Sequence, residues 1–561
     1  LDGNYMLAND IDMSEFYTFE PIGNETDGAF TGTFDGNGYA IIDLDLNYDS
    51  YKYVGLFGYL DGNVSNITLK NVDIIGGRYV GGIAGYADEN ANVSDCNVSG
   101  KIVIEDSYFT CYLGGIVGKS NCDISNCINE AALNKNGNSI YATNYIAGVV
   151  GYSTRNISGC ENKGSQTLEL YSGDYIAGIA AYANEIQMCK NLGKIGKEIQ
   201  NNSNYGAEEA YGIGCAKKSI GDCSNYGSVK GADKIYGIGK TDEKDIVNCA
   251  NYGDLGTRWT GYLVSDDVYG IGTANEIRDS YNTGKIEGDI IRGVGDAISG
   301  IYRCYDTGSS GRGGIYGITR STDSSLVQEC FSNGMAYSSD SINFYQDSNM
   351  RFSLDAMENQ FNIGKYLINP LKNTSKTLKE IVSSEELNLL DYENLWYRNE
   401  AYNDGLPIPK NIPEHLDLNH VLLVLNPGET AQLYGYLNGE RVDNIEWNSS
   451  DDSVIVEQTG EIKAKNSISK PVCVTAKTKD GFKMNCAVYV IDNAFAISRN
   501  SSTELRVGMQ EQLIARNYYT SEEEQNATVT WSSSNDNVAS VNEDGMVTTV
   551  GCGSTTITAI T

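Results

Sequence analysis

The sequence predicts an all-β protein made of a parallel β-solenoid, a small helical cap and two β-sandwiches. Three observations support this. A glycine-rich segment recurs along residues 1–335, the repeat stops between residues 336 and 416, and an alternating strand pattern occurs twice, at 417–492 and 493–561. A repeat of roughly 25 to 35 residues is typical of a solenoid. We therefore expect four regions with these boundaries.

The first part of each repeat predicts a short, sharply bent strand. It reads YVGGIAGYADENANVSDCNVSG at residues 79–100, and YLGGIVGKSNCDISNCINE follows from Tyr112. A shorter form, Y-G-I-G, starts at Tyr211, Tyr236 and Tyr269. The segment is too short and too rich in glycine for a helix. Glycine lets successive coils bend at the same place and stack closely.

The second part of each repeat, C-x-N-x-G, predicts two ladders. Cysteine and asparagine are two residues apart, so their side chains point to the same side of a strand. If coils stack about 4.8 Å apart, each asparagine amide can bond to the coils above and below. A small, buried cysteine fills the interior. The predicted ladder cysteines, reduced and buried, are Cys96, Cys127, Cys160, Cys189, Cys223, Cys249, Cys304 and Cys330.

A metal or redox array is the alternative interpretation of these cysteines. They are far apart in the sequence and no C-x-x-C occurs, so we expect no zinc site. Regular stacking also disfavours disulfides between neighbouring coils. Cys111, Cys122 and Cys215 lie outside the ladder pattern and receive no assignment.

The G-x-[YV]-[VI]-G-G-[IL]-x-G pattern resembles the GLUG motif of bacterial surface proteins. The opening LDGNYMLANDIDMSEFYTFEPIGNETDGAFTGTFDGNGYAIIDLDL is similar to the first coils of such arrays, and the resemblance covers about residues 1–335. It implies a right-handed parallel β-helix and an extracellular place, on the bacterial cell surface or secreted. The motif occurs in adhesins and also beside catalytic domains, so its implication for function is weak.

The segment 336–416 predicts the cap. Leu378, Ile381, Val382 and Leu387 follow a helical spacing, and a solenoid end must be covered to prevent pairing with another chain. Downstream, W-[NS]-S-S-[DN]-x-x-V occurs in both sandwich copies and resembles bacterial Ig-like domains of group 2, which usually act as spacers. Cys473 and Cys486 flank the KTKDGF turn. Their strand register decides whether a disulfide forms.

Composition excludes several partners. The chain has 41 basic and 74 acidic residues. The resulting net charge of -33 repels nucleic acid and anionic membranes. No apolar run approaches the roughly 18 residues of a membrane span, so we expect no membrane insertion. The sequence starts without methionine and stops inside a strand pattern, so we expect a piece of a longer protein. We further expect a monomer.

The residues that could carry chemistry do not form a known motif. His415 and His420 have the wrong spacing for a helical zinc pair, and neither a nucleophile elbow nor a calcium loop occurs. A carbohydrate-active enzyme would need paired carboxylates. Several acidic residues lie on or near predicted coils, but no pair of them recurs at an equivalent position of the repeat. These residues are Asp43, Asp45, Asp266, Asp267, Asp296 and Asp306. We therefore expect no enzyme, no metal and no cofactor.

The segments between repeats suggest a binding edge. They vary in length while the strands hold their pattern, and they fall at one phase of the repeat, where solenoids usually bind partners. The resemblance includes immunoglobulin-binding proteins, so we expect a surface adhesin that binds a host protein, such as an immunoglobulin, or a host glycan. An inert stalk and a carbohydrate-active β-helix enzyme are the alternatives. The candidate binding residues are Tyr108, Phe109, Tyr141, Tyr171, Tyr205, Trp259 and Tyr262.

Overall fold

A computed structural model shows an all-β chain with two compact units, one formed mainly by residues 1–360 and one mainly by residues 361–561. Up to residue 306 it describes all residues except 17–18, 25, 106–108, 137–142, 167–173, 197–206, 257–266 and 289. It describes only short stretches of 307–414, and beyond them it leaves out 467–471, 491–494, 500–505, 518–529 and 561. None of the helices in the described part has the length and hydropathy of a membrane span.

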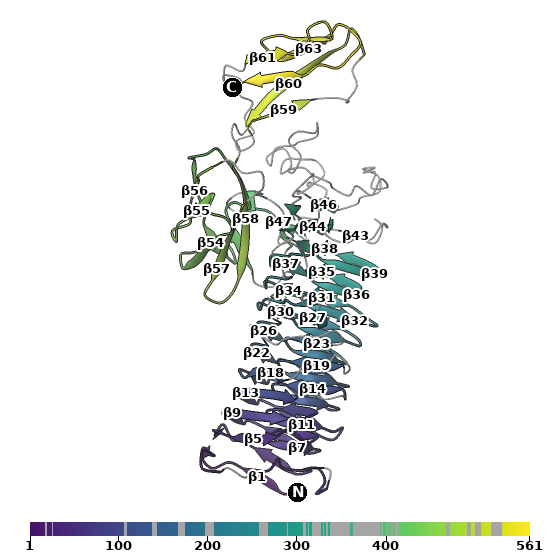
Figure 1. Cartoon of the computed structure of the whole chain (residues 1–561), viewed down its shortest axis with the longest axis vertical. Helices are drawn as coiled ribbons and strands as arrows, with labels where there is room; N and C mark the ends of the chain where they lie inside the picture. Colours follow the sequence, from purple (N-terminus) through teal and green to yellow (C-terminus); the bar gives the residue numbers. More distant parts are fainter. Residues whose placement is uncertain are drawn as a thin grey trace. The chain divides into compact units, whose positions relative to one another are not determined.

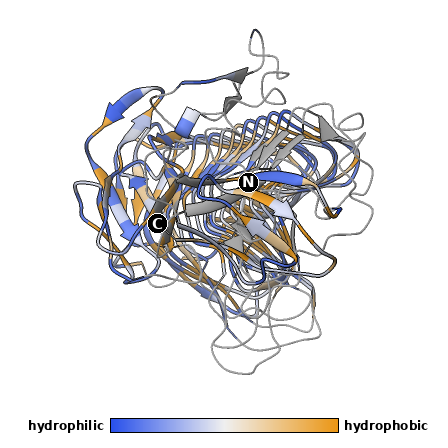
Figure 2. Ribbon diagram, turned by 90° about the horizontal axis from the view of Figure 1, so that it is seen from above, coloured by the Kyte–Doolittle hydropathy of each residue, from blue (hydrophilic) through white to orange (hydrophobic). Residues whose placement is uncertain are grey.

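The first unit is a parallel β-solenoid with three long sheets, as predicted. Its coils stack along the length of the unit (Figure 1) and superimpose when viewed from above (Figure 2). One sheet is ten-stranded, with one strand per coil: β6 (Tyr53–Val54), β10 (Tyr79–Gly81), β14 (Cys111–Gly114), β19 (Asn144–Ala147), β23 (Asp174–Ala177), β27 (Ala207–Tyr211), β31 (Ala232–Tyr236), β35 (Asp267–Tyr269), β38 (Ile290–Arg292) and β42 (Gly314–Tyr316).

The nineteen-stranded sheet follows after a sharp corner. Its strands include β7 (Phe57–Leu60), β11 (Ala84–Ala87), β15 (Val117–Ser120), β20 (Val150–Ser153), β24 (Ala180–Ala183), β28 (Gly214–Ala216), β32 (Gly239–Thr241), β36 (Gly272–Arg278) and β39 (Gly295–Tyr302). A second run of strands continues the same sheet: β8 (Asn63–Ser65), β12 (Asn92–Ser94), β16 (Ile124–Ser125), β21 (Ile157–Ser158), β25 (Ile186–Gln187), β29 (Ile220–Gly221) and β33 (Ile246–Val247).

The fifteen-stranded sheet completes each coil. It contains β9 (Thr68–Gly76), β13 (Asn97–Glu105), β17 (Ile128–Asn129), β22 (Glu161–Asn162), β26 (Lys190–Asn191), β30 (Ser224–Asn225), β34 (Ala250–Asn251), β37 (Tyr281–Asn282) and β40 (Tyr305–Asp306). The first coils contribute β1 (Asn4–Met6), β2 (Ile11–Asp12), β3 (Thr33–Asp35), β4 (Ala40–Ile42) and β5 (Asp45–Tyr48), and β18 (Ala132–Asn136) extends the edge beside β13. Val, Ile and Leu side chains from all three sheets fill one continuous core.

The asparagine ladder forms as predicted. Each Nδ2 donates to the Oδ1 of the asparagine one coil further on, at 2.7 to 2.9 Å, from Asn129 through Asn162, Asn191, Asn225 and Asn251 to Asn282. Asp306 accepts the last of these bonds at 2.8 Å. All of these side chains are fully buried, so the ladder satisfies polar groups that burial would otherwise leave unpaired.

The asparagine ladder lies against the glycines at the corners of the coils and leaves no room for a side chain there. A Cβ at Gly115, Gly148 or Gly178 would come within 2.4 Å of the amide carbon of the asparagine in the same coil. It would also meet the backbone oxygen of the next coil's glycine, 2.1 to 2.3 Å away. Val98 takes the place of the asparagine beside Gly82. The two halves of the repeat are therefore coupled, since the interior amide requires a corner without a side chain.

The cysteine ladder is confirmed for the residues whose side chains are described. These seven are free and buried, with at most 1% of their surface exposed: Cys96, Cys127, Cys160, Cys189, Cys223, Cys249 and Cys304. Cys330 begins β44 (Cys330–Ser332), and its side chain lies outside the described part. Cys111 and Cys122 join the same core, whereas Cys215 lies in a separate cluster with tyrosines. The predicted cap helix around Leu378–Leu387 also lies outside the described residues.

The second unit begins with a short hairpin and the first sandwich. Strands β47 (Trp396–Tyr397) and β48 (Ile408–Pro409) pair, and a 3-10 turn covers Asn403–Gly405. The sandwich contains β49 (Leu416–Leu418), β50 (Leu422–Leu425), β51 (Thr430–Gln432), β52 (Gly435–Leu437), β53 (Glu440–Val442), β54 (Ile445–Ser449), β55 (Val454–Val456), β56 (Glu461–Ala464), β57 (Val472–Thr478) and β58 (Lys483–Val490). All but one of its strand pairs are antiparallel.

The second sandwich repeats the local structure of the first. It contains β59 (Phe495–Arg499), β60 (Gln510–Asn517), β61 (Thr530–Ser533), β62 (Ala539–Val541), β63 (Met546–Thr549) and β64 (Ile557–Ile560). In both copies the motif tryptophan lies over a glycine with positive φ, Trp447 over Gly460 and Trp531 over Gly545. In both copies a glutamine side chain donates to two backbone oxygens, from Gln432 and from Gln512.

The structure answers the question about Cys473 and Cys486. Cys473 pairs with Ala487, and Cys486 pairs with Val474, so the two cysteines are one residue out of register. Successive side chains of a strand point to opposite faces, and a disulfide between these positions is therefore excluded. Both are buried and neither forms a disulfide, and burial raises the pKa of Cys486 well above its usual value.

Candidate binding face

The predicted insert residues lie almost entirely outside the described structure. Tyr108, Tyr141, Tyr171, Tyr205, Trp259 and Tyr262 all fall there. Phe109 is described, and 63% of its surface is exposed. The Arg78 guanidinium lies between it and the solenoid, 5.3 Å from the ring centres of both Phe109 and Tyr79. Phe109 therefore connects the predicted insert edge with an aromatic surface on the sheets themselves.

That surface begins as a row of tyrosines on the outer side of the ten-stranded sheet. Parallel register aligns Tyr53, Tyr79, Tyr112, Tyr145 and Tyr175 in successive coils. Neighbouring ring centres are 5.0 to 5.5 Å apart, and from Tyr79 onward the planes differ by only 7 to 13°. The rings stack along the solenoid axis and turn their edges outward, since each face is covered by the next ring.

A second row lies on the outer side of the nineteen-stranded sheet. It consists of Tyr59, Tyr86, Lys119, Tyr152 and Tyr182 in successive coils. Rings of the two rows meet edge to face across the corner, with Tyr152 at 5.8 Å from Tyr112 and 5.3 Å from Tyr145. We call these ten residues the tyrosine strip. Apart from Tyr79, which is 9% exposed, its side chains are half-buried.

The residue next to the corner decides where the strip stays open. In the first coils this position holds Gly81, Gly114, Ala147 and Ala177. In the next coil it holds Tyr211, which pairs with Ala177 and not with Tyr175. The short-form tyrosines therefore do not continue the strip. Tyr211, Tyr236 and Tyr269 stack in the corner and are 6% exposed or less.

Ion pairs accompany these corner tyrosines. Glu209 takes the position of the strip tyrosine in its coil, and its carboxylate contacts Lys234 at 3.6 Å and Lys240 at 3.7 Å. It also accepts hydrogen bonds from the hydroxyls of Tyr211 and Tyr236. Further along, Arg292 binds Asp267 and Asp296, each at 2.7 Å. The cations of this half of the solenoid are thus neutralised by carboxylates.

The strip itself carries cations in a different setting. Lys52, Arg78 and Lys119 come from three successive coils, and their charged groups lie 5.9, 5.3 and 6.0 Å from the ring centre of Tyr79. Lys119 also lies over Tyr112 at 5.0 Å and Tyr152 at 5.5 Å. Burial, together with the positive charge of Arg78, lowers the pKa of Lys119. Among the described residues, no carboxylate forms an ion pair with Arg78 or Lys119.

The hydroxyl groups of the strip divide into bonded and unbonded ones. Tyr59 and Tyr86 donate to Asp88, at 2.7 and 3.3 Å. Within the described structure, no hydrogen bond joins the hydroxyls of Tyr112, Tyr145 and Tyr152 to another protein group, and the three side chains are half-buried. Burial raises the pKa of Tyr112 and of Tyr175 to about 12. The strip therefore offers neutral phenols from two successive coils, Tyr112 in one and Tyr145 with Tyr152 in the next.

The other candidate residues occupy structural places. Asp43 accepts a bond from Asn71, Asp306 ends the asparagine ladder, and Asp45 lies on an exposed strand position. His415 pairs with Asp417, and His420 with Asp404. Asp266 lies outside the described residues. Among the residues that are described, no group of three or more His, Cys, Asp or Glu could hold a metal ion.

Sequence reasoning missed the strip because it treated the repeat tyrosine as part of the stacking pattern. A signal was available in the alternation of the strands. Tyr145 directly precedes Ile146, whose side chain points inward. Tyr152 follows Gly151 and precedes the buried Ser153, and the position before this tyrosine holds a small residue in each of these coils. An aromatic residue at an outward position in several coils predicts an outer ladder. The cations at positions 78 and 119 gave no such periodic signal.

The comparisons with known proteins agree with this architecture. Residues 76–103 match the family described as the GLUG motif, and residues 493–561 match the family described as bacterial Ig-like domain (group 2). The chain contains both modules. Part of the GLUG match is the strip itself, from β10 to β13, and the first sandwich shares the tryptophan and glycine arrangement of the matched second one.

One curated relative is Halomucin from Haloquadratum walsbyi, which is 36% identical over 129 residues. The match covers 21% of the chain but spans only 1% of the length of Halomucin. A solved structure from Bacteroides ovatus, described as a "putative immunoglobulin A1 protease", aligns with 74% of this chain and 87% of its own. Its identity of 15% and TM-score of 0.25 are too low to support any argument. The family and sequence matches indicate a surface or extracellular protein.

Proposed function

We propose that the chain is a non-enzymatic adhesin of the bacterial cell surface, in which the solenoid binds a glycan along the tyrosine strip. The observation that carries this proposal is the group of half-buried tyrosines Tyr112, Tyr145 and Tyr152, whose rings pack together on the two rows and whose hydroxyls form no hydrogen bond among the described residues. Tyrosine combines an apolar ring with a hydroxyl that donates and accepts hydrogen bonds. Sugars present the same combination of apolar C–H faces and hydroxyls.

The spacing of the row also favours a linear polysaccharide. Strands of successive coils are about 4.8 Å apart, and the stacked rings repeat at 5.1 to 5.5 Å. This distance is close to the length that one sugar ring adds to an extended polysaccharide. A polymer lying along the solenoid axis could therefore meet an equivalent tyrosine at each ring. A small sugar would gain nothing from such a repeat.

The test uses the full chain and a glycan array that includes linear polysaccharides. In the triple variant Tyr112→Phe, Tyr145→Phe and Tyr152→Phe the stacked rings remain and only the hydroxyls are lost. We expect binding to weaken by about a hundredfold, since three hydrogen bonds are lost and each contributes about 1 kcal/mol. The control, Tyr5→Phe with Tyr39→Phe, removes exposed hydroxyls outside the strip. Equal binding by both variants would contradict the proposal.

A host protein such as an immunoglobulin remains the second candidate ligand. The exposed ring of Phe109 at the insert edge favours it, because aromatic side chains anchor many protein interfaces. The test is a pull-down from host secretions with the full chain and with the variant Trp259→Ala, Tyr262→Ala. Loss of a captured protein in this variant, with glycan binding intact, would favour the protein ligand.

The two sandwiches are proposed as spacers. Their strands are short, and the small core of the second consists of Leu513, Ala539 and Val547 with a few partly buried neighbours. An inert stalk is the alternative function for the whole chain. It predicts that neither glycans nor host proteins bind, in any of the experiments above.

A further inference from the structure

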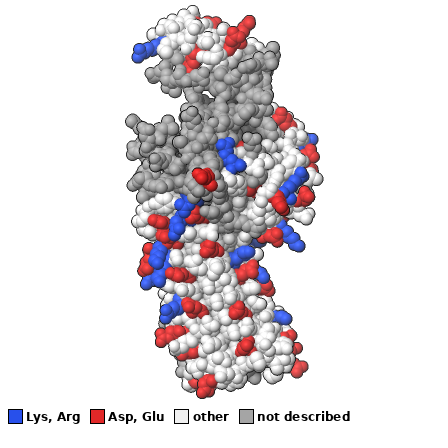
Figure 3. Space-filling view, turned by 180° about the vertical axis from the view of Figure 1, so that it is seen from behind, with Lys and Arg blue, Asp and Glu red and all other residues white. Residues whose placement is uncertain are grey.

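The cations of the strip suggest which class of glycan binds, an inference that rests on the proposed function. The chain has a net charge of -33, and acidic side chains are spread along the solenoid on the face that Figure 3 shows. Against this background, Lys52, Arg78 and Lys119 gather within 6.0 Å of the ring centre of Tyr79. Like charges repel each other, so such a cluster has a cost unless something compensates it.

The aromatic rings offset only part of this cost. A cation over a tyrosine ring gains only a modest attraction at exposed sites, and the single ring of Tyr79 is shared among three cations. The Nε of Arg78 donates to the backbone oxygen of Thr110 at 3.2 Å. Its Nη groups form no ion pair with any described carboxylate. Two aromatic rings and one carbonyl oxygen therefore hold the guanidinium, and its Nη groups can donate to a ligand.

The same repeat shows what a compensated arrangement looks like. Five coils beyond Arg78, Lys234 and Lys240 share the carboxylate of Glu209, and two coils further Arg292 lies between Asp267 and Asp296. Carboxylates therefore neutralise these three cations, whereas among the described residues no carboxylate pairs with Arg78 or Lys119. Arg78 and Lys119 lie where the strip is open.

We propose that Arg78 and Lys119 bind the carboxylate or sulfate groups of a linear acidic polysaccharide that lies along the tyrosine strip. Charge complementarity identifies the ligand, because an anion would relieve the repulsion between the two cations. A guanidinium offers paired donors that match a carboxylate or sulfate. The tyrosine hydroxyls on either side bind the hydroxyls of the neighbouring sugar rings.

The test measures binding of the full chain to polygalacturonate, heparin and a neutral dextran of similar length. We expect uronate or sulfate polymers to bind more tightly than dextran, and to bind more weakly as salt is raised, because exposed charges are screened. In the variant Arg78→Gln, Lys119→Gln the affinity should fall by about tenfold or more. The control Lys217→Gln, Lys218→Gln makes the same charge change outside the strip and should alter the affinity less than about twofold.

A second measurement reports on contact. Burial and Arg78 lower the pKa of Lys119 in the free protein, so an anion bound beside it should raise that pKa, which an NMR titration of the lysine side chain would show. Circular dichroism establishes that the Gln variants fold. Should dextran bind as tightly as the acidic polymers, the preference for charge is refuted while the proposed function stands.

Two further outcomes would also refute the inference. If none of the polysaccharides binds, both this inference and the glycan-binding proposal fail. If polyglutamate binds as tightly as polygalacturonate and loses affinity equally in the Arg78→Gln, Lys119→Gln variant, the site recognises negative charge alone. The assignment to a polysaccharide is then wrong.

Discussion

At the residue scale, the most consequential side chain that the sequence did not reveal is Lys135. Its side chain is 1% exposed and pairs with Asp174, also 1% exposed, at 3.2 Å. Asn144 donates to the other carboxylate oxygen at 2.6 Å. A lysine near a variable insert is normally expected in solvent. Its burial depends on coils that are adjacent in space and distant in sequence, so no local pattern predicts it.

This buried pair gives a prediction for stability. Lys135→Ala leaves the Asp174 carboxylate buried without its cation, which should lower the free energy of unfolding by about 3 to 5 kcal/mol. Urea denaturation followed by circular dichroism measures the change. The control is Lys163→Ala, whose pair with Glu130 is 40% and 51% exposed and should contribute no more than about 1 kcal/mol. Equal effects of the two variants would refute this account of Lys135.

At the element scale, the corner of each coil shows why the motif needs its glycines. Two of them, Gly148 and Gly151, occupy one coil but face different surroundings. A Cβ on Gly148 would enter the asparagine ladder, and one on Gly151 would meet backbone atoms of the neighbouring coil. The next coil holds Gly178 at the first position but Ala181 at the second. The solenoid therefore tolerates a methyl group at one of the two positions.

Substitution of these glycines tests the coupling between corner and ladder. Gly148→Ala should destabilise the solenoid by about 3 kcal/mol, the upper end of typical overpacking costs. Gly151→Ala should cost about 1 kcal/mol. Thermal unfolding of both variants gives the comparison. A larger effect of Gly151→Ala would show that the approach of the backbones, and not the asparagine, determines the motif.

The tyrosine strip predicts a loss of stability at alkaline pH. The pKa of Tyr112 and of Tyr175 rises from 10.0 in the unfolded chain to about 12 in the fold. The unfolded state then loses its protons first, so the contribution of these tyrosines to stability is complete below pH 10 and declines as the pH rises toward 12. Denaturation midpoints between pH 9 and pH 12, with tyrosinate absorbance as a second signal, test this window. A midpoint that stays constant across it would contradict the assigned burial.

At the scale of the whole molecule, the sequence predicted the architecture well and the site only in part. Periodic features, namely the corner glycines and the Cys and Asn positions, predicted the solenoid because each coil repeats the same contacts. Features that do not repeat from coil to coil were not predicted. The shift of register that places Tyr211 beside Ala177 breaks the repeat pattern at one coil, so the periodicity of the sequence could not predict it. The cation cluster depends on three coils at once.

Thiol reactivity reports on the integrity of the whole solenoid. The ladder cysteines are buried, and burial raises the pKa of Cys223 well above its usual value and that of Cys215 to about 12. Only thiolates react with iodoacetamide. Among the cysteines with described side chains, the exposed Cys552 should therefore be alkylated at pH 8 at least about a hundredfold faster than the others. Mass spectrometry of native and urea-unfolded protein identifies the labelled sites, and rapid native labelling of Cys127 or Cys189 would contradict their burial.

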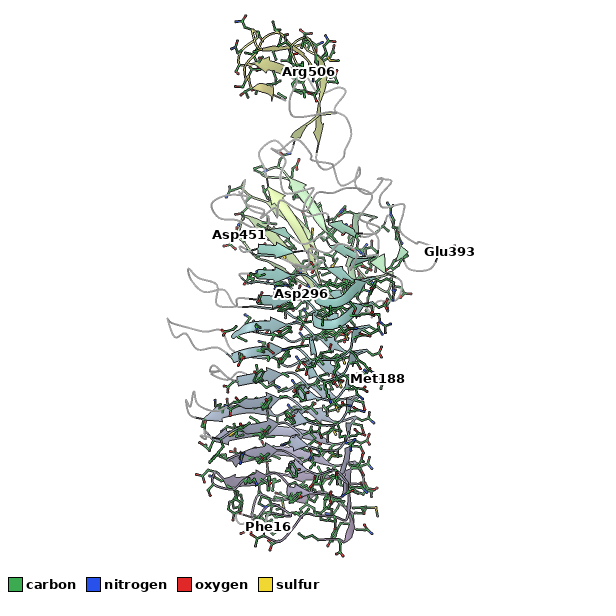
Figure 4. All side chains as sticks on the ribbon, turned by 90° about the vertical axis from the view of Figure 1, so that its right-hand side faces the viewer. Phe16, Met188, Asp296, Glu393, Asp451 and Arg506 are labelled. Atoms are coloured by element: carbon green, nitrogen blue, oxygen red, sulfur yellow. The ribbon has the colours of Figure 1, made fainter. Side chains whose placement is uncertain are left out.

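Exposed side chains such as Met188, labelled in Figure 4 at the edge of the solenoid, show that turns accept varied residues. The position beside the corner is different, since a change from Ala177 to Tyr211 ends the open strip. Duplication of one coil with a small residue there would lengthen the recognition surface by one step of about 4.8 Å. Duplication of a coil with tyrosine at that position would lengthen the solenoid but not the open strip. Under the proposed function, the number of coils would set the length of the solenoid, and this single residue would set the length of polysaccharide that it can bind.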